Sequence, residues 1–150
     1  MGTTLNEIGQ HLDHLGWPYG YDEEQDCLVT SVTADNVDHF LIAIDLDEEG
    51  DYLCLTAPEL LIIDDHPHKQ QLWKTLLAIA WEAKLLCWVY DPETGELSAR
   101  IAMTLEGASL TAQQLQRLLS AITNLIDREA MPRIRTVLAT GRDPGRVVLV

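Results

Sequence analysis

The feature that most constrains the fold of this chain is a hairpin in its second half. Residues 85–105 read LLCWVYDPETGELSARIAMTL, and the turn DPETG places proline and glycine where a hairpin loop of four or five residues needs them. Apolar and polar residues alternate after the turn, so one face of the outgoing strand is expected to be buried and the other wet. The apolar set is Leu97, Ala99, Ile101, Met103 and Leu105. Strands joined by so short a turn must run antiparallel.

Three strand-like runs earlier in the chain are also joined by short polar turns. They read CLVTSVT, HFLIAIDL and YLCLTA, and they are separated by ADNVD and by DEEGD. Pro58 is expected to end the last of these runs. The segment WPYGY, followed by DEEQD as its turn, is a candidate for one further short strand. The sequence therefore predicts an antiparallel sheet.

Three helices are expected around these strands. The first reads TTLNEIGQHLDHLG, with Thr3 or Thr4 as its cap and a glycine at its end. The second is expected over residues 67–85. The third begins at its cap, Thr111, and must be kinked or interrupted at Pro132, because proline removes a backbone donor and crowds the preceding turn.

The order of these elements predicts an α+β fold. Helix, three strands, helix, two strands and helix, written α-β(3)-α-β(2)-α, form a two-layer α/β sandwich in which helices cover one face of the antiparallel sheet. At 150 residues the chain is most simply one domain. We expect that domain to span residues 1–140. Residues 141–150, GRDPGRVVLV, are expected to form a C-terminal tail that is either disordered or paired as an edge strand.

The charge of the chain limits its partners. Ten Lys and Arg residues against 24 Asp and Glu residues give a formal net charge of -14. Such a field repels phosphate backbones and anionic lipid headgroups, so we expect no nucleic-acid and no membrane partner, and basic proteins or cations are favoured. The sequence shows no secretory signal and no apolar run long enough to span a membrane, which predicts a cytoplasmic protein.

The stretch DDHPH, in the middle of the chain, looks more like a chemical site than any other. Zinc binds histidine and aspartate, but Pro67 separates the two histidines and fixes the local backbone. The simpler interpretation is a helix start, in which Asp64 or Asp65 caps the helix and the proline occupies its first turn. Two further histidines lie three residues apart on the first helix. The alternative is a small metal- or ligand-binding regulatory domain built from His11, His14, His66 and His68.

No other motif indicates catalysis or a cofactor. GxxxxGK[ST], GxGxxG and GxSxG are all absent, and the acidic runs DEEQD and DLDEEGD lack the ligand spacing of an EF-hand loop. The three cysteines lie far apart without a CxxC pair, so we expect buried reduced thiols at Cys27, Cys54 and Cys87. The sequence therefore predicts a protein that is not an enzyme and that holds no cofactor.

The second helix is too apolar around its circumference for one buried face. Its main stripe is Leu72, Leu76, Ile79, Ala80 and Ala83. Trp73, Leu77 and Trp81 widen this stripe to an arc of about 200°, roughly twice what one buried face requires. A two-layer domain leaves part of such an arc in water, and exposed aromatic patches mark contact surfaces. We expect Trp73, Leu77 and Trp81 to form a self-association or partner surface; the alternative is that another helix or loop covers them.

Most of the chain resembles a known family. WKTLLAIAWEAKLLCWVYDPETGELSARIAMTLEGASLTAQQLQRLLSAITNLID, together with LTAPELLIIDDHPHKQQLW before it, is similar to the YbjN-like proteins, whose fold is that of the type III secretion chaperones such as the Tir chaperone. The resemblance covers residues 5–140 and implies the α-β(3)-α-β(2)-α domain. It also implies a non-enzymatic, chaperone-like protein-binding module, because these relatives bind polypeptide segments, and a homodimer, because secretion chaperones often pair through the second helix. It does not identify the client protein.

Overall fold

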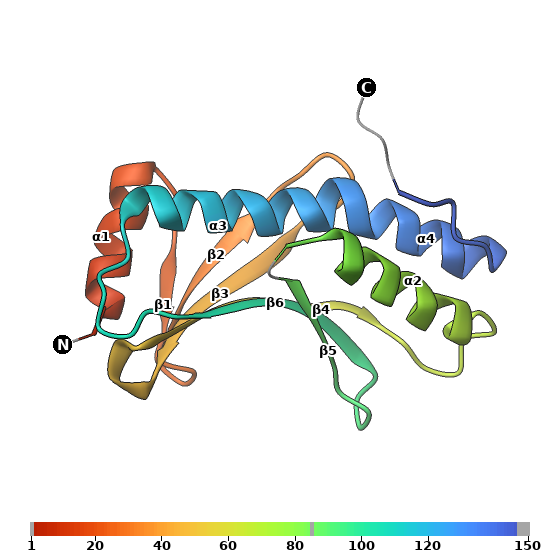
Figure 1. The fold of residues 1–150 in the computed structure, drawn as a ribbon, viewed down its shortest axis with the longest axis horizontal. Coiled ribbons are helices and arrows are strands. Elements are labelled where there is room, and N and C mark those ends of the chain that lie inside the picture. Colours follow the sequence, from red (N-terminus) through yellow and green to blue (C-terminus); the bar gives the residue numbers. More distant parts are fainter. Residues whose placement is uncertain (1, 85, 147–150) are drawn as a thin grey trace.

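The apolar runs and their short turns fold into one antiparallel sheet with helices over one of its faces (Figure 1). The structure, a computed structural model, describes residues 2–84 and 86–146. The first half of the chain forms α1 (Leu5–Leu15), β1 (Gly20–Asp22), β2 (Cys27–Val32), β3 (Phe40–Asp47), the 3-10 turn η1 (Glu48–Gly50) and β4 (Tyr52–Ile62). The second half forms α2 (Lys69–Glu82), β5 (Leu86–Tyr90), β6 (Glu96–Thr104), α3 (Ala112–Asn124), the π-helical η2 (Leu125–Ala130) and α4 (Met131–Thr140). The predicted α+β class is confirmed, with the short first strand present and the last helix divided.

The order of the strands in the sheet is β1-β2-β3-β4-β6-β5, and all neighbouring pairs are antiparallel. In the middle of the sheet Ile44 lies opposite Leu55, and Leu55 lies opposite Ile101. These three side chains are at most 2% exposed, and they form the core under the helices. The alternation predicted for β6 is confirmed for Leu97, Ala99 and Ile101, which are buried on one face, whereas Met103 is half-buried.

Strand β4 continues past the point where the sequence predicts its end. Pro58 does not stop the strand, which runs on to Ile62 after a bulge between Ala57 and Leu61. A bulge is one of the few places where a strand tolerates proline, because the ladder bond that proline cannot donate is already missing there. Glu59 takes a left-handed conformation with φ 51° within this bulge. The prediction that the strand ends at Pro58 was therefore wrong.

The caps of the first and third helices are the predicted ones. The Thr4 hydroxyl accepts a hydrogen bond from the backbone N–H of Glu7 at 3.2 Å, and the left-handed Gly16 ends α1 with φ 79°. Thr111 and Gln114 form a reciprocal capping box at the start of α3, with side-chain to backbone distances of 3.0 and 2.9 Å. Local side-chain chemistry fixes both helix starts.

The start of α2 differs from the prediction. Neither Asp64 nor Asp65 caps the helix; His68 occupies the cap position, and its side chain makes no capping bond. The ring of His66 instead accepts a hydrogen bond from the backbone N–H of His68 at 3.1 Å. The helix ends at Glu82, earlier than predicted, and Leu85 lies outside the described residues. The His66 ring, in the turn before the helix, therefore accepts the hydrogen bond near the helix start where an aspartate cap was expected.

Pro132 interrupts the long last helix as predicted, and the irregular turn lies just before it. Residues 125–130 are π-helical, and the backbone N–H of Met131 bonds to the carbonyl of Ile126, five residues back. This π turn buries Asp127, which is 3% exposed. The Asp127 carboxylate accepts hydrogen bonds from the backbone N–H groups of Asn36 and Val37 at 2.6 and 3.0 Å. The helix layer thereby holds the loop between β2 and β3.

Two further sequence expectations concern the ends of the chain and the membrane. Asp143 forms an ion pair with Arg133 of α4, so the first part of the predicted tail lies against the domain. Residues 147–150 lie outside the described residues, and the choice between disorder and an edge strand stays open for them. In the part of the chain that the structure describes, no helix is both long and apolar enough to cross a membrane.

We expect Asp127→Ala to lower the free energy of unfolding by about 2 kcal/mol, because it leaves two backbone donors of the β2–β3 loop without their charged acceptor. Urea unfolding measures the change. Asp35→Ala is the matched control. It removes the same charge from the β2–β3 loop itself. The Asp35 side chain is 84% exposed and its ion pair with Arg128 is long, at 4.0 Å, so the effect should stay below about 0.5 kcal/mol. Equal losses for the two variants would contradict a structural role for Asp127.

Candidate protein-binding surface on α2 and β5

Helix α2 packs with one side only. Its buried residues are Leu72, Thr75, Leu76 and Ile79. On another side of the helix Leu77 is 71% exposed and Trp81 is 88% exposed. Because these two residues lie at i and i+4, they are neighbours on the helix surface. No helix or loop of the described residues covers this part of the predicted arc.

Trp73 lies at the inner end of the same stripe but is half-buried. Its ring contacts Tyr90 of β5 edge to face, with 4.8 Å between the ring centroids and an interplanar angle of 71°. The Lys69 ammonium lies 5.8 Å from the centroid of each ring. Edge-to-face packing and a nearby cation both stabilise such a pair. Trp73 therefore anchors α2 to the sheet, and the solvent-facing part of the predicted surface consists of Leu77 and Trp81.

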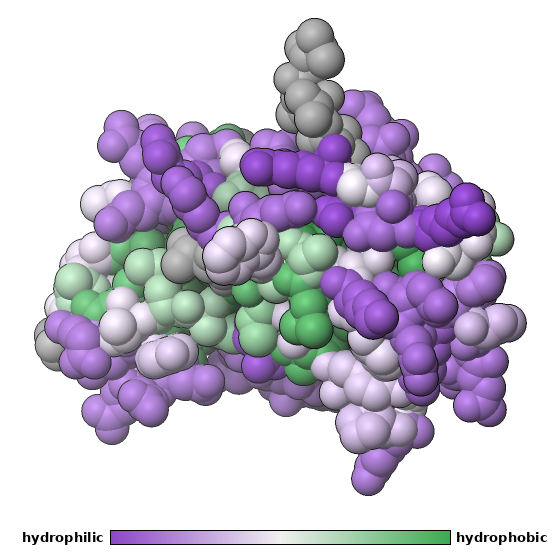
Figure 2. Space-filling model, turned by 45° about the vertical axis from the view of Figure 1, so that its right-hand side comes forward, coloured by the Kyte–Doolittle hydropathy of each residue, from purple (hydrophilic) through white to green (hydrophobic). Residues whose placement is uncertain are grey.

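Strand β5 extends this surface beyond the helix. The indole N–H of Trp88 donates to the carbonyl of Leu76 at 2.9 Å, which fixes β5 beside α2. β5 pairs with β6 and with no other strand of the described residues, so its outer edge is open. Figure 2, which brings the right-hand side of Figure 1 forward, shows a hydrophobic surface between hydrophilic margins above and below. An open strand edge beside exposed apolar side chains is a typical template for contact with another chain.

A buried arginine fixes the far end of α2. The guanidinium of Arg133 on α4 donates to Glu82 at 2.7 Å and to both carboxylate oxygens of Asp143 at 2.6 and 2.8 Å. Its side chain is 5% exposed. The hydrogen bonds from Arg133 lower the pKa of Asp143, and the same bonds raise the pKa of Arg133. The role of Arg133 was not predicted from the sequence, because nothing local shows that a helix arginine will meet two distant carboxylates.

A hollow lies next to this end of α2. It has a volume of about 310 Å³, and its walls come from the end of α2, from β6 and from the α3–η2 helix. Among the residues that line it are Glu82, Ala83, Ile101, Asn124 and Leu125. Glu82 and Ala83, which line the hollow, directly follow Trp81 in the sequence. The exposed Trp81 ring and this partly apolar hollow therefore lie at the same end of the helix.

The structure does not bring the four histidines together. The ring of His11 contacts the carbonyl of Leu110, just before α3, at 2.7 Å. The ring of His68 lies against Gly141, just after α4. The helical run between these two contacts, residues 112–140, is on the order of 40 Å long. Among residues 2–84 and 86–146 there is no group of three or more His, Cys, Asp or Glu that could hold a metal ion, so the four-histidine site predicted as the alternative was wrong.

The cysteines differ in exposure, although all three were expected to be buried. Cys27 is buried, Cys54 is half-buried and Cys87 is exposed. Burial raises the pKa of the Cys27 and Cys54 thiols. Cys87 lies on the edge strand β5, in register with Arg100. It is exposed because no helix of the described residues covers that face, which an apolar local sequence cannot reveal.

Comparison with known proteins identifies the fold. No protein-family model matches the chain, and no curated protein matches its sequence. Among solved structures, YbjN from E. coli, a proposed transcription regulator, is similar with a TM-score of 0.61 and 17% sequence identity over 82% of this chain and 88% of YbjN. The chain therefore has the YbjN-like fold.

Two further structures with this fold are complexes between proteins. The complex of ExsC with ExsE gives a TM-score of 0.52 and 18% identity over 93% of this chain and 96% of the matched chain. The HopA1–SchA chaperone–effector complex gives a TM-score of 0.50 and 18% identity over 78% of this chain and 84% of the matched one. The predicted resemblance to the type III secretion chaperone fold is confirmed.

The lowered pKa of Asp143 predicts an acid-sensitive contribution to stability. A carboxyl whose pKa is depressed on folding stabilises the protein above its ordinary pKa, and this contribution is lost as the pH falls through the folded value. We therefore expect Asp143→Asn to lower the free energy of unfolding by about 1 kcal/mol near pH 7, and by less at an acidic pH that approaches the lowered pKa of Asp143. Urea unfolding at both pH values measures the difference. Asp65→Asn, at an exposed position, is the control and should change stability by less than about 0.5 kcal/mol. A loss for Asp143→Asn that is the same at both pH values would rule out an ionic contribution.

Proposed function

We propose that this protein is a non-enzymatic, chaperone-like protein-binding module that works in the cytoplasm as a homodimer. The observation that carries the proposal is the exposure of Leu77 and Trp81 on a helix whose other side is firmly anchored. A flexible segment could bury such residues by folding back. This helix cannot, because Trp88 and Arg133 fix its orientation. The second copy then provides the cover.

The energy available from this contact is comparable with the cost of association. Burying a tryptophan side chain removes about 200 Å² from water, on the order of 5 kcal/mol at about 25 cal/mol per Å². In a twofold dimer the same surface is used by both subunits, so each copy contributes one Trp81 and one Leu77. Association itself costs on the order of 4–15 kcal/mol, and the paired contributions are of the same order.

The hollow at the end of α2 supports a twofold arrangement. A twofold interface must be complementary to itself, so a protruding ring on one subunit needs a recess on the other. Trp81 and the hollow lie at the same end of the helix. If the twofold axis of the dimer passes near that end, the two α2 helices run antiparallel and the Trp81 indole of each subunit faces the hollow of the other. The open β5 edge lies beside α2 and would lie at the margin of such an interface.

The binding of a client protein is supported by the proteins that share the fold. SchA is one component of a chaperone–effector complex with HopA1, and ExsC forms a complex with ExsE. Both are built on the same arrangement of helices and sheet as this chain. A fold that leaves hydrophobic surface on a rigid frame suits the capture of another polypeptide.

The dimer is tested by the mass of the protein in solution. Light scattering should give twice the 16.8 kDa of one chain, and the double variant Leu77→Asp/Trp81→Asp should halve that mass, because buried unpaired carboxylates prevent the contact. Tyr21→Asp is the matched control. It also replaces an exposed aromatic residue, 55% exposed, but on β1 at the other side of the sheet, and it should leave the dimer intact. A wild-type protein that is monomeric at micromolar concentration would remove the dimer from the proposal.

The binding module is tested by affinity capture from a lysate of the source cell. We expect wild-type protein to retain specific polypeptides, which mass spectrometry identifies. Each candidate is then made separately, and its binding to the purified wild-type protein and to Tyr21→Asp is compared by calorimetry. A purified candidate that binds both proteins with equal affinity supports the proposal. If none of the captured polypeptides binds the wild-type protein after separate purification, the proposal is contradicted.

A further inference from the structure

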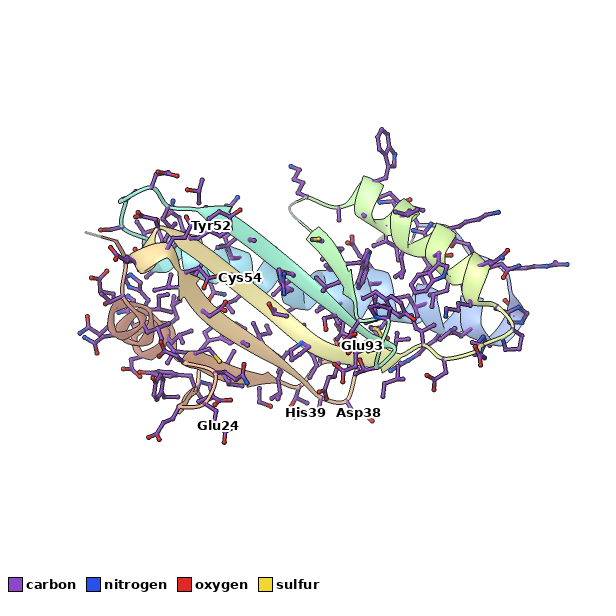
Figure 3. All side chains as sticks on the ribbon, turned by 90° about the horizontal axis from the view of Figure 1, so that it is seen from below. Glu24, Asp38, His39, Tyr52, Cys54 and Glu93 are labelled. Carbon is purple, nitrogen blue, oxygen red and sulfur yellow. The ribbon has the colours of Figure 1, made fainter. Side chains whose placement is uncertain are left out.

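The face of the sheet opposite the helices forms a second surface, separate from α2. Figure 3 shows this face from below, with Tyr52 and Cys54 of β4 on it and the helices behind or beside the strands. Leu41 and Tyr52 are each 40% exposed. The side chains between them are small and only half-buried: Ala43, Cys54, Thr56 and Ala102. These residues lie side by side, because Ala43 pairs with Thr56 and Cys54 pairs with Ala102. The centre of this outer face is therefore made mostly of small side chains, with Asp45 next to Cys54 and Arg100 next to Thr56.

The outer face is bordered by negative charge. Glu24, Asp38 and Glu93 lie around its margin (Figure 3). Asp45 and Asp47 of β3 point to the same face as Cys54 and Tyr52, their partners in register. Burial raises the pKa of Asp45, the charge of Asp47 raises it further, and Arg100 partly opposes both effects. Arg100 lies next to Thr56 in the sheet register.

The negative border continues at the η1 end of the sheet. A hollow of about 740 Å³ there has acidic walls formed by Glu7, Glu49, Asp51 and Glu106. No lysine or arginine is among the described residues that line it. The outer face thus combines a centre of small side chains, which also holds Asp45 and Arg100, with a rim rich in carboxylates. His39, hydrogen-bonded to the Ser31 hydroxyl at 3.0 Å, also lies at this margin (Figure 3).

The sheet also limits what kind of chain can bind to this face. β3, β4 and β6 each have a paired strand on both sides. Their backbone N–H and C=O groups are already used in the ladders, so the face offers side chains and hardly any free backbone partners. A polypeptide lying on it must satisfy its own backbone hydrogen bonds, which an α-helix does and an isolated extended strand does not.

We propose that the outer face binds a basic amphipathic helix of another protein. The apolar stripe of that helix would cover Leu41, Ala43 and Ala102, and its lysines and arginines would face the acidic rim. The eight residues of β3 span about 26 Å, which about 17 helical residues match in length. The inference rests on the proposed function, since it names the class of client, but it uses a surface that the α2 contact leaves free.

A designed peptide tests this inference without knowledge of the natural client. The probe is a fluorescent peptide of about 18 residues made of leucine and lysine, with leucine at i, i+3, i+4 and i+7. We expect it to bind the wild-type protein and to become helical on binding, as measured by anisotropy and circular dichroism. A leucine–glutamate peptide of the same pattern, and a leucine–lysine peptide of the same composition without the stripe, should each bind at least about tenfold more weakly.

Variants locate the binding site. Leu41→Lys/Asp47→Lys, on strand β3, should weaken binding of the striped leucine–lysine peptide about tenfold or more. The rim variant Glu24→Lys/Asp38→Lys, which changes only turn and loop residues, should weaken it by a similar factor. Asp65→Lys makes the same charge change per position near the start of α2, and should weaken binding less than about threefold. The unfolding midpoint of each variant shows that it is folded. If the unstriped peptide binds as tightly as the striped one, the attraction is non-specific and the inference fails.

The two proposed surfaces are separated by the variant Leu77→Asp/Trp81→Asp. We expect this variant to be monomeric and still to bind the striped peptide with less than about a threefold change. Loss of peptide binding in this variant, with binding retained in the outer-face variants, would place the peptide on α2 and overturn the inference while leaving the proposed function intact. If the wild-type protein is monomeric and binds the peptide at the outer face, the dimer is removed from the proposed function and the inference about the outer face stands.

Discussion

The structure depends on a packing constraint: one layer of helices can bury only one face of a sheet, and one face of the sheet can bury only one side of each helix. Ile44, Leu55 and Ile101 fill the space between the layers and are at most 2% exposed. Everything apolar beyond that layer must lie at the surface. Both candidate surfaces, the α2–β5 side and the outer face of the sheet, follow from this arrangement.

Specific polar contacts make the exposed side of α2 a rigid surface. The hydrogen bond from Trp88 to the Leu76 carbonyl fixes the helix to β5, and Arg133 holds its last turn through Glu82. A buried arginine with two carboxylate partners is weak as a source of net stability but strong as a constraint on geometry, because any other arrangement leaves a buried charge unpaired. Rigid presentation lowers the entropy lost on binding, which favours association through this helix.

Local patterns were sufficient for much of the fold. The DPETG hairpin, the caps at Thr4 and Thr111 and the interruption at Pro132 were all predictable, since each depends on residues a few positions apart. Predictions failed where a distant partner changed the local preference. Pro58 sits in a bulge opposite β6, and the cap of α2 is replaced by a bond between two histidines. The binding role of Trp73, Leu77 and Trp81 stays a prediction.

The sequence by itself determined the kind of elements, their order and the excess of apolar residues on α2, because hydrophobic period, turn residues and caps act over short distances. Only the tertiary structure decided that β5 is an edge strand, that Trp73 packs on Tyr90 while Trp81 stays 88% exposed, and that Arg133 meets Glu82 and Asp143. It also decided that the histidines lie at opposite ends of the helix layer. These outcomes depend on which strands become neighbours, and strand order is set by contacts between residues far apart in the chain.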